Sequence, residues 1–257
     1  MEEHTHPPVH LHPHKKEEGL NQLSLQQAIV LNGLIIAAGI IIAALMMTHA
    51  PAGTTGAKVG ATAGASQGAT AAIDIKNVKT SGDPFIGNPN APVVLAYWSD
   101  YQCPYCKQFE TTTFQNILKD YVASGKVAVV FKDFSFLGPD SDTAAVYARS
   151  VWTLYPNQFY AWRTALFDAQ DKENGGFGDE PSVEKLTGTV AGIDAAKVAA
   201  DVKKNRDAYM KEVEADKSEG ASFGIQGTPS FITGATLIPG VVPYGTFTDA
   251  FDAQLKK

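Results

Sequence analysis

The chain of 257 residues has two cysteines, Cys103 and Cys106, which are separated only by Pro104 and Tyr105. Disulfide bonds that hold a small fold together come from more cysteines at wider spacing. A bond across so short a loop removes little conformational entropy from the unfolded chain, so it stabilises a fold weakly. We therefore expect the pair to carry out redox chemistry, in which two thiols and a disulfide interconvert.

A helix that begins at Pro104 would give the two sulfurs different roles. Proline suits the first helical position, because its fixed φ is helical and the N–H group that it lacks would have no partner there. Cys103 would then lie beside free backbone N–H groups and the positive end of the helix dipole, which both favour the thiolate. We expect Cys103 to be the nucleophile and Cys106, one turn further on, to be the resolving thiol. The disulfide itself is the redox group, so no further cofactor is expected.

The positions of the histidines argue against two other uses of cysteine. All six histidines lie at or before His49, far from the cysteine pair in the sequence. A zinc site needs about four ligands, and a cysteine hydrolase needs a base such as histidine. We therefore expect neither a metal site nor a hydrolase at the pair. A structural disulfide in a turn is a weaker alternative that stays open.

The first 80 residues divide into three segments by composition. Residues 1–27 are polar and hold five of the six histidines, which is typical of a disordered tail. Residues 28–47 carry no charge and would span about 30 Å as a helix, which predicts a transmembrane anchor rather than a cleaved signal peptide. Residues 48–80 begin with a long Ala-, Gly- and Thr-rich run and are expected to form a flexible linker. Alternating histidines such as those of the tail can bind transition metals, although a solvated tail is the simpler expectation.

The redox chemistry also predicts an orientation for this single-pass chain. A stable disulfide donor needs an oxidising compartment, so residues 81–257 are expected outside the cytoplasm, periplasmic or extracellular, and the tail inside it. Lys15 and Lys16 before the span, against Lys58 soon after it, favour the same orientation. The net charge of -6 and the small number of arginines argue against a nucleic-acid partner.

Residues 81–257 show the alternating pattern of an α/β domain. Apolar runs at 92–98 and 126–136 predict two strands with a helix between them, a βαβ unit with parallel pairing. Helical periodicity follows at 143–155 and 157–170, where Pro156 should break the helix, and again at 182–191 and 194–219. Gly234 then joins strands at 229–233 and 236–238 in a tight hairpin, and a final helix closes the chain.

Three segments of this domain resemble the DsbA-like branch of the thioredoxin superfamily. They are Trp98 to Cys106 (WSDYQCPYC), Phe131 to Phe134 (FKDF) and Phe223 to Ile232 (FGIQGTPSFI). The resemblance implies a thioredoxin-like fold interrupted by an all-helical subdomain at about 138–220. It also implies that the Thr228–Pro229 peptide bond is cis and lies opposite the dithiol, where its loop would present backbone groups to a substrate chain.

The sequence departs from the family pattern around the dithiol. Tyr97 stands six residues before the first cysteine, where relatives often carry a buried Glu, although Lys132 matches the basic position near that Glu. Asp100 is nearer in sequence and is a candidate for proton transfer, with a solvent-facing cap or turn role as the alternative. Tyr105 replaces the histidine of the strongest oxidants, so we expect a less extreme oxidant.

The resemblance and the anchor together predict a membrane-tethered thiol–disulfide oxidoreductase. The leading hypothesis is that it donates the Cys103–Cys106 disulfide, through a mixed disulfide on Cys103, to cysteine-containing secreted or envelope proteins. A membrane redox partner would then reoxidise the dithiol. The alternatives are a reductase or isomerase that uses the same dithiol, and a tethered binding or holdase module whose dithiol is vestigial.

Overall fold

The computed structural model describes residues 71–173 and 175–256. These residues belong to one folded unit. The expected tail at 1–27, the expected membrane span at 28–47 and the linker up to residue 70 lie outside the described residues. None of the helices in the described ranges combines the length and the apolar composition that crossing a bilayer requires.

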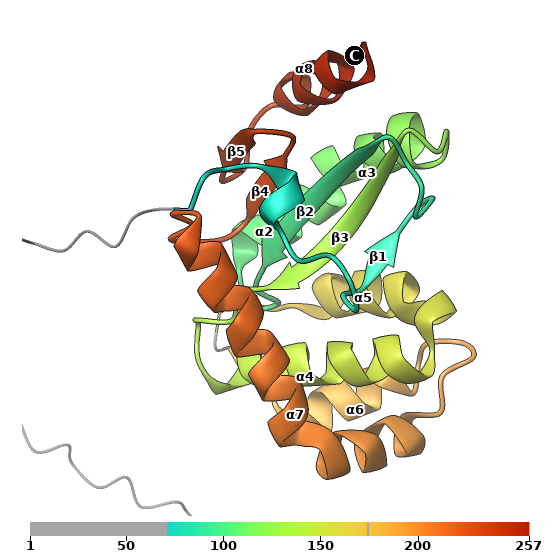
Figure 1. Cartoon of the computed structure of the whole chain (residues 1–257). Helices are drawn as coiled ribbons and strands as arrows, with labels where there is room; N and C mark the ends of the chain where they lie inside the picture. Colours follow the sequence, from blue (N-terminus) through green and yellow to red (C-terminus); the bar gives the residue numbers. More distant parts are fainter. Residues whose placement is uncertain (1–70, 174, 257) are drawn as a thin grey trace, which may run out of the picture. The chain divides into compact units, whose positions relative to one another are not determined.

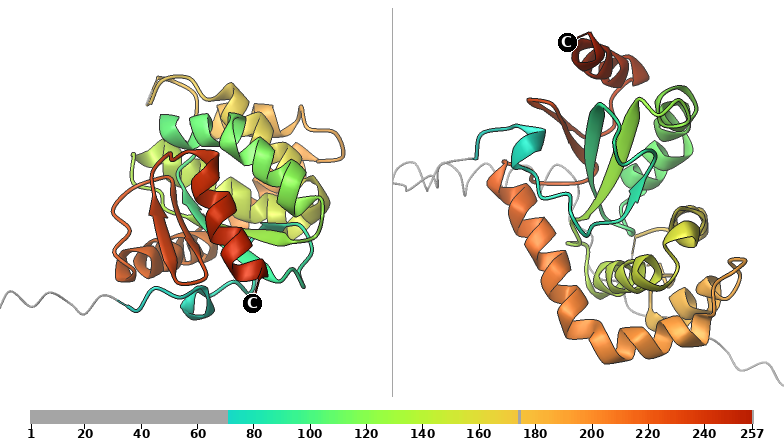
Figure 2. Two further views of the ribbon diagram at one scale, coloured as in Figure 1. Left: turned by 90° about the horizontal axis from the view of Figure 1, so that it is seen from above. Right: turned by 45° about the vertical axis from the view of Figure 1, so that its right-hand side comes forward.

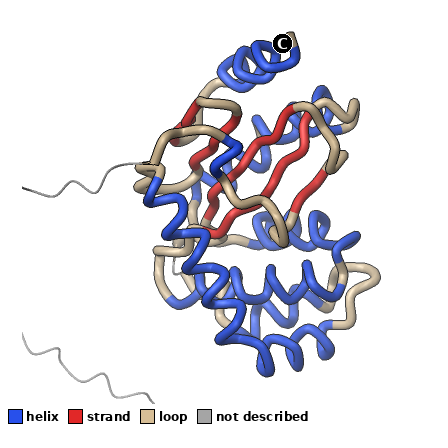
Figure 3. Tube along the Cα trace, in the orientation of Figure 1, coloured by secondary structure: helices blue, strands red, loops and turns tan. Residues whose placement is uncertain are grey.

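The centre of this unit is a five-stranded mixed sheet with the order β1-β3-β2-β4-β5 (Figures 1 and 3). The strands are β1 (Phe85–Ile86), β2 (Val93–Ser99), β3 (Val127–Asp133), β4 (Ser230–Thr233) and β5 (Thr236–Pro239). Strands β2 and β3 pair in parallel, as the βαβ pattern predicts, and the other three pairings are antiparallel. Gly234 has a φ of 54° in the β4–β5 turn, which suits a glycine at the tight hairpin that we expected.

The helix that links β2 to β3 is interrupted rather than continuous. It consists of α2 (Pro104–Thr111), α3 (Thr113–Ile117) and a π-helical turn, η2 (Leu118–Val122). Thr112 breaks it, with φ −124° and ψ −89°, outside the helical region. The sequence pattern alone predicts one helix over this stretch, and the apolar residues that define the pattern are buried as expected.

The alternation of side chains along β2 divides the apolar core between the two faces of the sheet. Val93, Leu95 and Tyr97 point to the larger cluster, which includes both cysteines. Ala96 and Trp98 point to a smaller cluster on the opposite face. The dithiol therefore belongs to one face of the sheet, and this division decides which buried side chains can act on it.

A group of helices separates β3 from β4 in sequence and forms the predicted helical insertion. It contains α4 (Pro139–Leu154), η3 (Pro156–Gln158), α5 (Phe159–Ala169), α6 (Glu180–Thr187) and α7 (Ala195–Ser222). Figure 1 shows α4, α5 and α6 gathered at one end of the sheet, with α7 running from them along its side, and Figure 2 shows the same arrangement from two other directions. The closing helix, α8 (Tyr244–Leu255), lies at the opposite end.

The end of the expected flexible linker is folded onto the domain, so the prediction of a linker is wrong for residues 71–80. The Ala71 N–H donates to the Ser222 carbonyl at 2.7 Å, and the Ile75 N–H donates to the Gly234 carbonyl at 2.7 Å. A short 3-10 helix, η1 (Ile75–Asn77), follows, and Val78 is buried in the smaller core cluster. These apolar residues come after the Ala/Gly/Thr-rich run, which explains why overall composition concealed their role.

Candidate active site

Cys103 occupies the N-cap position of α2, and Pro104 is the first residue of the helix, as predicted. The Cys103 side chain is only 4% exposed, while Tyr105 beside it is 62% exposed. A hydrogen bond from the Cys106 thiol is the main cause that lowers the pKa of Cys103 to about 6. Burial opposes this shift, and hydrogen bonds from Thr228 and from the backbone N–H groups of Tyr105 and Cys106 add to it. At neutral pH Cys103 is therefore mostly thiolate, the reactive form.

Cys106 lies one turn inside the helix and is completely buried. Burial, followed by the neighbouring Cys103, raises the pKa of its thiol well above the ordinary value. The two cysteines are free thiols in the structure. A neutral thiol that donates to a neighbouring thiolate is the arrangement that suits a resolving cysteine and an attacking cysteine.

The Thr228–Pro229 peptide bond is cis, as the resemblance implies. Its loop lies against the dithiol, since the Cys103 Sγ is 3.4 Å from the Thr228 carbonyl oxygen, to which the protonated thiol can donate. The adjacent cavity of about 290 Å³ is lined by residues 224–230 and by Leu237, Pro239 and Gly240. The structure thus brings the pair Cys103 and Cys106 together with Thr228 and Pro229, which lie more than 120 residues later in the sequence.

Asp100 is buried, so the prediction that it faces solvent is wrong, although its carboxylate does take the turn role that was the alternative to proton transfer. Its carboxylate accepts hydrogen bonds from the Gln102 N–H at 2.8 Å, the Phe136 N–H at 2.9 Å and the Ser141 hydroxyl at 2.7 Å. Burial raises the pKa of Asp100 in spite of these bonds. The contacts join the turn before the dithiol to the beginning of α4, so the carboxylate fixes the position of that turn.

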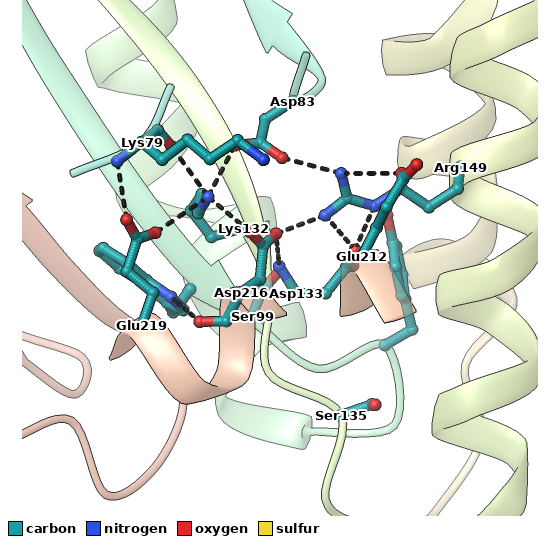
Figure 4. Close-up of polar contacts among 12 residues, drawn as sticks. Lys79, Asp83, Ser99, Lys132, Asp133, Ser135, Arg149, Glu212, Asp216 and Glu219 are labelled. Atoms are coloured by element: carbon teal, nitrogen blue, oxygen red, sulfur yellow. Dashed lines mark hydrogen bonds and ion pairs between the residues drawn. The ribbon is translucent and has the colours of Figure 1, made fainter. Parts of the chain in front are cut away.

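Lys132 lies on the other face of the sheet, so its predicted place near the dithiol is wrong. It is opposite Trp98 in the β2–β3 register, whereas Tyr97 is opposite Phe131 and faces the cysteines. The Lys132 Nζ is 2.6 Å from Asp83, 2.5 Å from Asp216 and 3.0 Å from Glu219 (Figure 4). One residue of difference along a strand reverses the face, which is why the sequence match misplaced this side chain.

Lys132 is part of a larger buried charge cluster on that face. Arg149 of α4 pairs with Asp83 at 2.8 Å and with Asp133 at 2.7 Å, and it also contacts Asp216 (Figure 4). Because α4, α7, β3 and the segment before β1 each contribute to it, this cluster joins the helical insertion to the sheet. Its role is structural, and it does not contact either sulfur.

Three buried polar residues near the dithiol are absent from the sequence-based predictions. The Gln170 Nε2 donates to the Tyr101 carbonyl at 2.6 Å and to the Cys103 carbonyl at 3.2 Å, which holds the loop before α2. The Arg163 guanidinium pairs with Glu110 at 2.7 Å, and both side chains are buried. Arg163 is one of three arginines in the chain, and this small number is the only sequence feature that distinguishes it.

Comparison with known proteins agrees with this site. A family model described as thioredoxin matches residues 79–253. Disulfide bond formation protein D of Bacillus subtilis is 29% identical over 178 residues, covering 68% of this chain and 78% of the relative.

Solved structures of other proteins share this fold. The crystal structure of oxidised BdbD from Bacillus subtilis superposes with a TM-score of 0.66 at 25% identity, covering 74% of this chain and 99% of that one. The thiol–disulfide exchange protein alpha-DsbA2 from Wolbachia pipientis has the same fold, with a TM-score of 0.62 at 22% identity over 70% of this chain and 90% of that one. The chain belongs to the thioredoxin family, within which it is a DsbA-like thiol–disulfide oxidoreductase.

Proposed function

We propose that the protein donates the Cys103–Cys106 disulfide to cysteine-containing proteins through a mixed disulfide on Cys103. The observation that carries the proposal is the position of Cys103 at the start of α2, beside Cys106 and against the Thr228 loop, where its pKa is lowered to about 6. A thiol of low pKa is a good leaving group and stabilises the reduced form of the pair, so the disulfide becomes more oxidising. Disulfide donation is therefore the activity that this site supports best.

The surface around Cys103 suits an extended protein substrate. The cis-Pro loop, which lines a cavity, contacts the Cys103 sulfur, and Tyr105 in the dithiol motif is exposed to solvent. A substrate segment would pair with backbone groups of this loop as a short added strand. Such recognition depends little on substrate side chains, which fits an enzyme that acts on many proteins with free cysteines.

The proposal includes a place for the reaction. The uncharged run at 28–47 is long enough to anchor the chain in a membrane, with the folded domain on the oxidising side. The substrates would be secreted or envelope proteins, because disulfide bonds form and persist in an oxidising compartment. A membrane redox protein would restore the disulfide after each cycle. Fractionation of cells that express the full chain, with protease added to intact cells, tests both the anchor and its orientation.

The equilibrium reduction potential of the pair against glutathione tests the direction of transfer. We expect a value between about −270 mV, that of thioredoxin, and about −120 mV, that of DsbA. A potential at or below the thioredoxin value would overturn the oxidase proposal in favour of a reductase. A Cys106→Ala variant should accumulate a mixed disulfide with a reduced protein substrate once Cys103 is activated by a small disulfide. Full activity of a Cys103→Ala variant would instead make the dithiol vestigial.

A further inference from the structure

Cys106 must exchange a proton during the reaction, yet it has no contact with solvent. Its sulfur is 0% exposed, and its raised pKa means that the free thiol holds a proton at neutral pH. When the disulfide opens, this sulfur leaves as a thiolate and must be protonated. The proton therefore has to reach it through groups of the protein.

The Tyr97 hydroxyl is the polar group best placed to supply that proton. It is fully buried in the core cluster that also holds Cys106. Cys106 and Glu110 lie one turn apart on α2, and both raise the pKa of this hydroxyl. Within the described residues the hydroxyl has no hydrogen-bond partner of standard geometry. A buried hydroxyl without a fixed partner is rare and costly, so its presence near a thiol and a carboxyl calls for a functional explanation.

Glu110 connects Tyr97 to solvent. Its carboxyl is held by Arg163, with the Oε1 atom 2.9 Å from Nε and 2.7 Å from an Nη atom, and the guanidinium carbon lies 5.0 Å from the centre of the Tyr97 ring. Burial raises the pKa of Glu110 even though Arg163 opposes the shift, so this carboxyl binds a proton more readily than an exposed one. Glu110 also lines a cavity of about 230 Å³ with Thr111 and Gln115, which gives water a path to the carboxyl.

We infer that the Tyr97 hydroxyl and the Glu110 carboxyl form a proton route that serves the Cys106 sulfur. The inference rests on thiol–disulfide exchange at the Cys103–Cys106 pair, and it applies to either direction of transfer. Tyr97 touches the reacting sulfur, whereas Glu110 acts through Tyr97, and Arg163 positions Glu110.

The proton and electron balance of the step is as follows. A substrate thiolate attacks the Cys103 Sγ, a substrate–Cys103 disulfide forms, the bond to Cys106 breaks, and its electron pair stays on the Cys106 Sγ. The Tyr97 hydroxyl gives its proton to that sulfur and takes one from the Glu110 carboxyl. Glu110 then recovers a proton from water in the adjacent cavity. In the reverse step Cys106 attacks the mixed disulfide, and its proton returns along the same groups.

A Tyr97→Phe variant tests the route, because it keeps the ring and removes only the hydroxyl. The oxidised full-length protein is mixed with excess dithiothreitol, quenched with acid and alkylated, and the opening of the disulfide is timed by mass spectrometry. We expect opening to slow by about 100-fold at pH 7, the low end of the effect of a positioned proton donor. The matched control is Tyr147→Phe, which removes the hydroxyl of another fully buried tyrosine that lacks a partner. Tyr147 belongs to α4, and its substitution should leave the rate unchanged.

A Glu110→Gln variant and a pH series separate proton transfer from packing. Corrected for the thiolate fraction of dithiothreitol, the wild-type rate should fall as Glu110 loses its proton, and it should show a solvent deuterium isotope effect. Both features should disappear in Glu110→Gln and in Tyr97→Phe. The titratable or charged groups that face the route are Cys103, Cys106, Tyr101, Glu110, Tyr160, Arg163 and Asp168.

The possible outcomes are distinct. A wild-type rate in Tyr97→Phe would overturn the inference. A slow Tyr97→Phe beside a wild-type Glu110→Gln would overturn the part of the route through Glu110. If Glu110→Gln does not fold, the Tyr97→Phe rate and its isotope effect still decide the role of Tyr97. Failure of the wild-type protein to transfer its disulfide to protein thiols would count against the proposed function alone, because the dithiothreitol assay does not depend on it.

Discussion

The hydrogen bond from the Cys106 thiol is the largest single stabiliser of the Cys103 thiolate. A Cys106→Ala variant removes it while leaving the start of α2 and the Thr228 loop in place. A hydrogen bond to a charged group contributes about 1.5–3 kcal/mol, and one pKa unit corresponds to about 1.36 kcal/mol. The loss should therefore raise the pKa of Cys103 by about 1–2 units, from about 6 to about 7–8.

The matched control is Cys106→Ser, because its hydroxyl can still donate to the thiolate. We expect the pKa of Cys103 in this variant to stay closer to 6 than in Cys106→Ala. The ultraviolet absorbance of the thiolate, followed over a pH series, gives both values, and a double variant that also carries Cys103→Ala gives the baseline. The rate of alkylation by iodoacetamide over the same pH range provides an independent measurement.

A Cys106→Ala variant whose Cys103 pKa stays near 6 would refute this account. The lowered pKa would then come from the backbone N–H groups and the dipole at the start of α2, with no need for a neighbouring thiol. Equal pKa values for the Ala and Ser variants, both well above 6, would show that the hydroxyl does not replace the thiol as a donor.

Three further predictions concern titration and stability. Reduction of the disulfide should take up two protons below pH 6 and one proton above pH 6, because Cys103 titrates near 6 and Cys106 far higher. The slope of the measured reduction potential should therefore change near pH 6 from about −59 to about −30 mV per pH unit. Lys132→Met should lower the free energy of unfolding by about 3–5 kcal/mol in a urea titration, because it leaves buried carboxylates unpaired. The pKa of Cys103 should stay at its wild-type value in this variant. Gly220→Ala should lower the free energy of unfolding by about 1–3 kcal/mol, because its Cβ would meet the Trp98 Nε1 at 2.8 Å. Gly245→Ala, whose Cβ would meet nothing within 4 Å in α8, should cause no loss.

Local features of the sequence predicted the parts of the structure that depend on neighbours in the chain. The apolar runs gave the central strands, Pro104 gave the beginning of α2, and Pro156 gave the break between α4 and α5. The Thr228–Pro229 segment required the family resemblance, because a single X–Pro pair seldom indicates a cis bond.

Features that depend on long-range packing were not predictable in the same way. Glu110 and Arg163 are 53 residues apart, and neither belongs to a motif. Asp100 became a buried link because its partners in the segment before α4 lie 36 or more residues away. In each case the sequence shows a polar residue in an unremarkable context, and only the fold determines whether it is solvated, paired or unpartnered.

The face on which Lys132 lies affects the chemistry of the dithiol. The cluster around Lys132 and Arg149 contains five acidic residues for two cations, namely Asp83, Asp133, Glu212, Asp216 and Glu219. An excess of buried negative charge next to Cys103 would disfavour its thiolate and raise its pKa. The sheet instead separates Lys132 and its acidic partners from the sulfurs. The alternation of Phe131 and Lys132 along β3 thus lets one strand carry a structural charge cluster on one side and support a stable thiolate on the other.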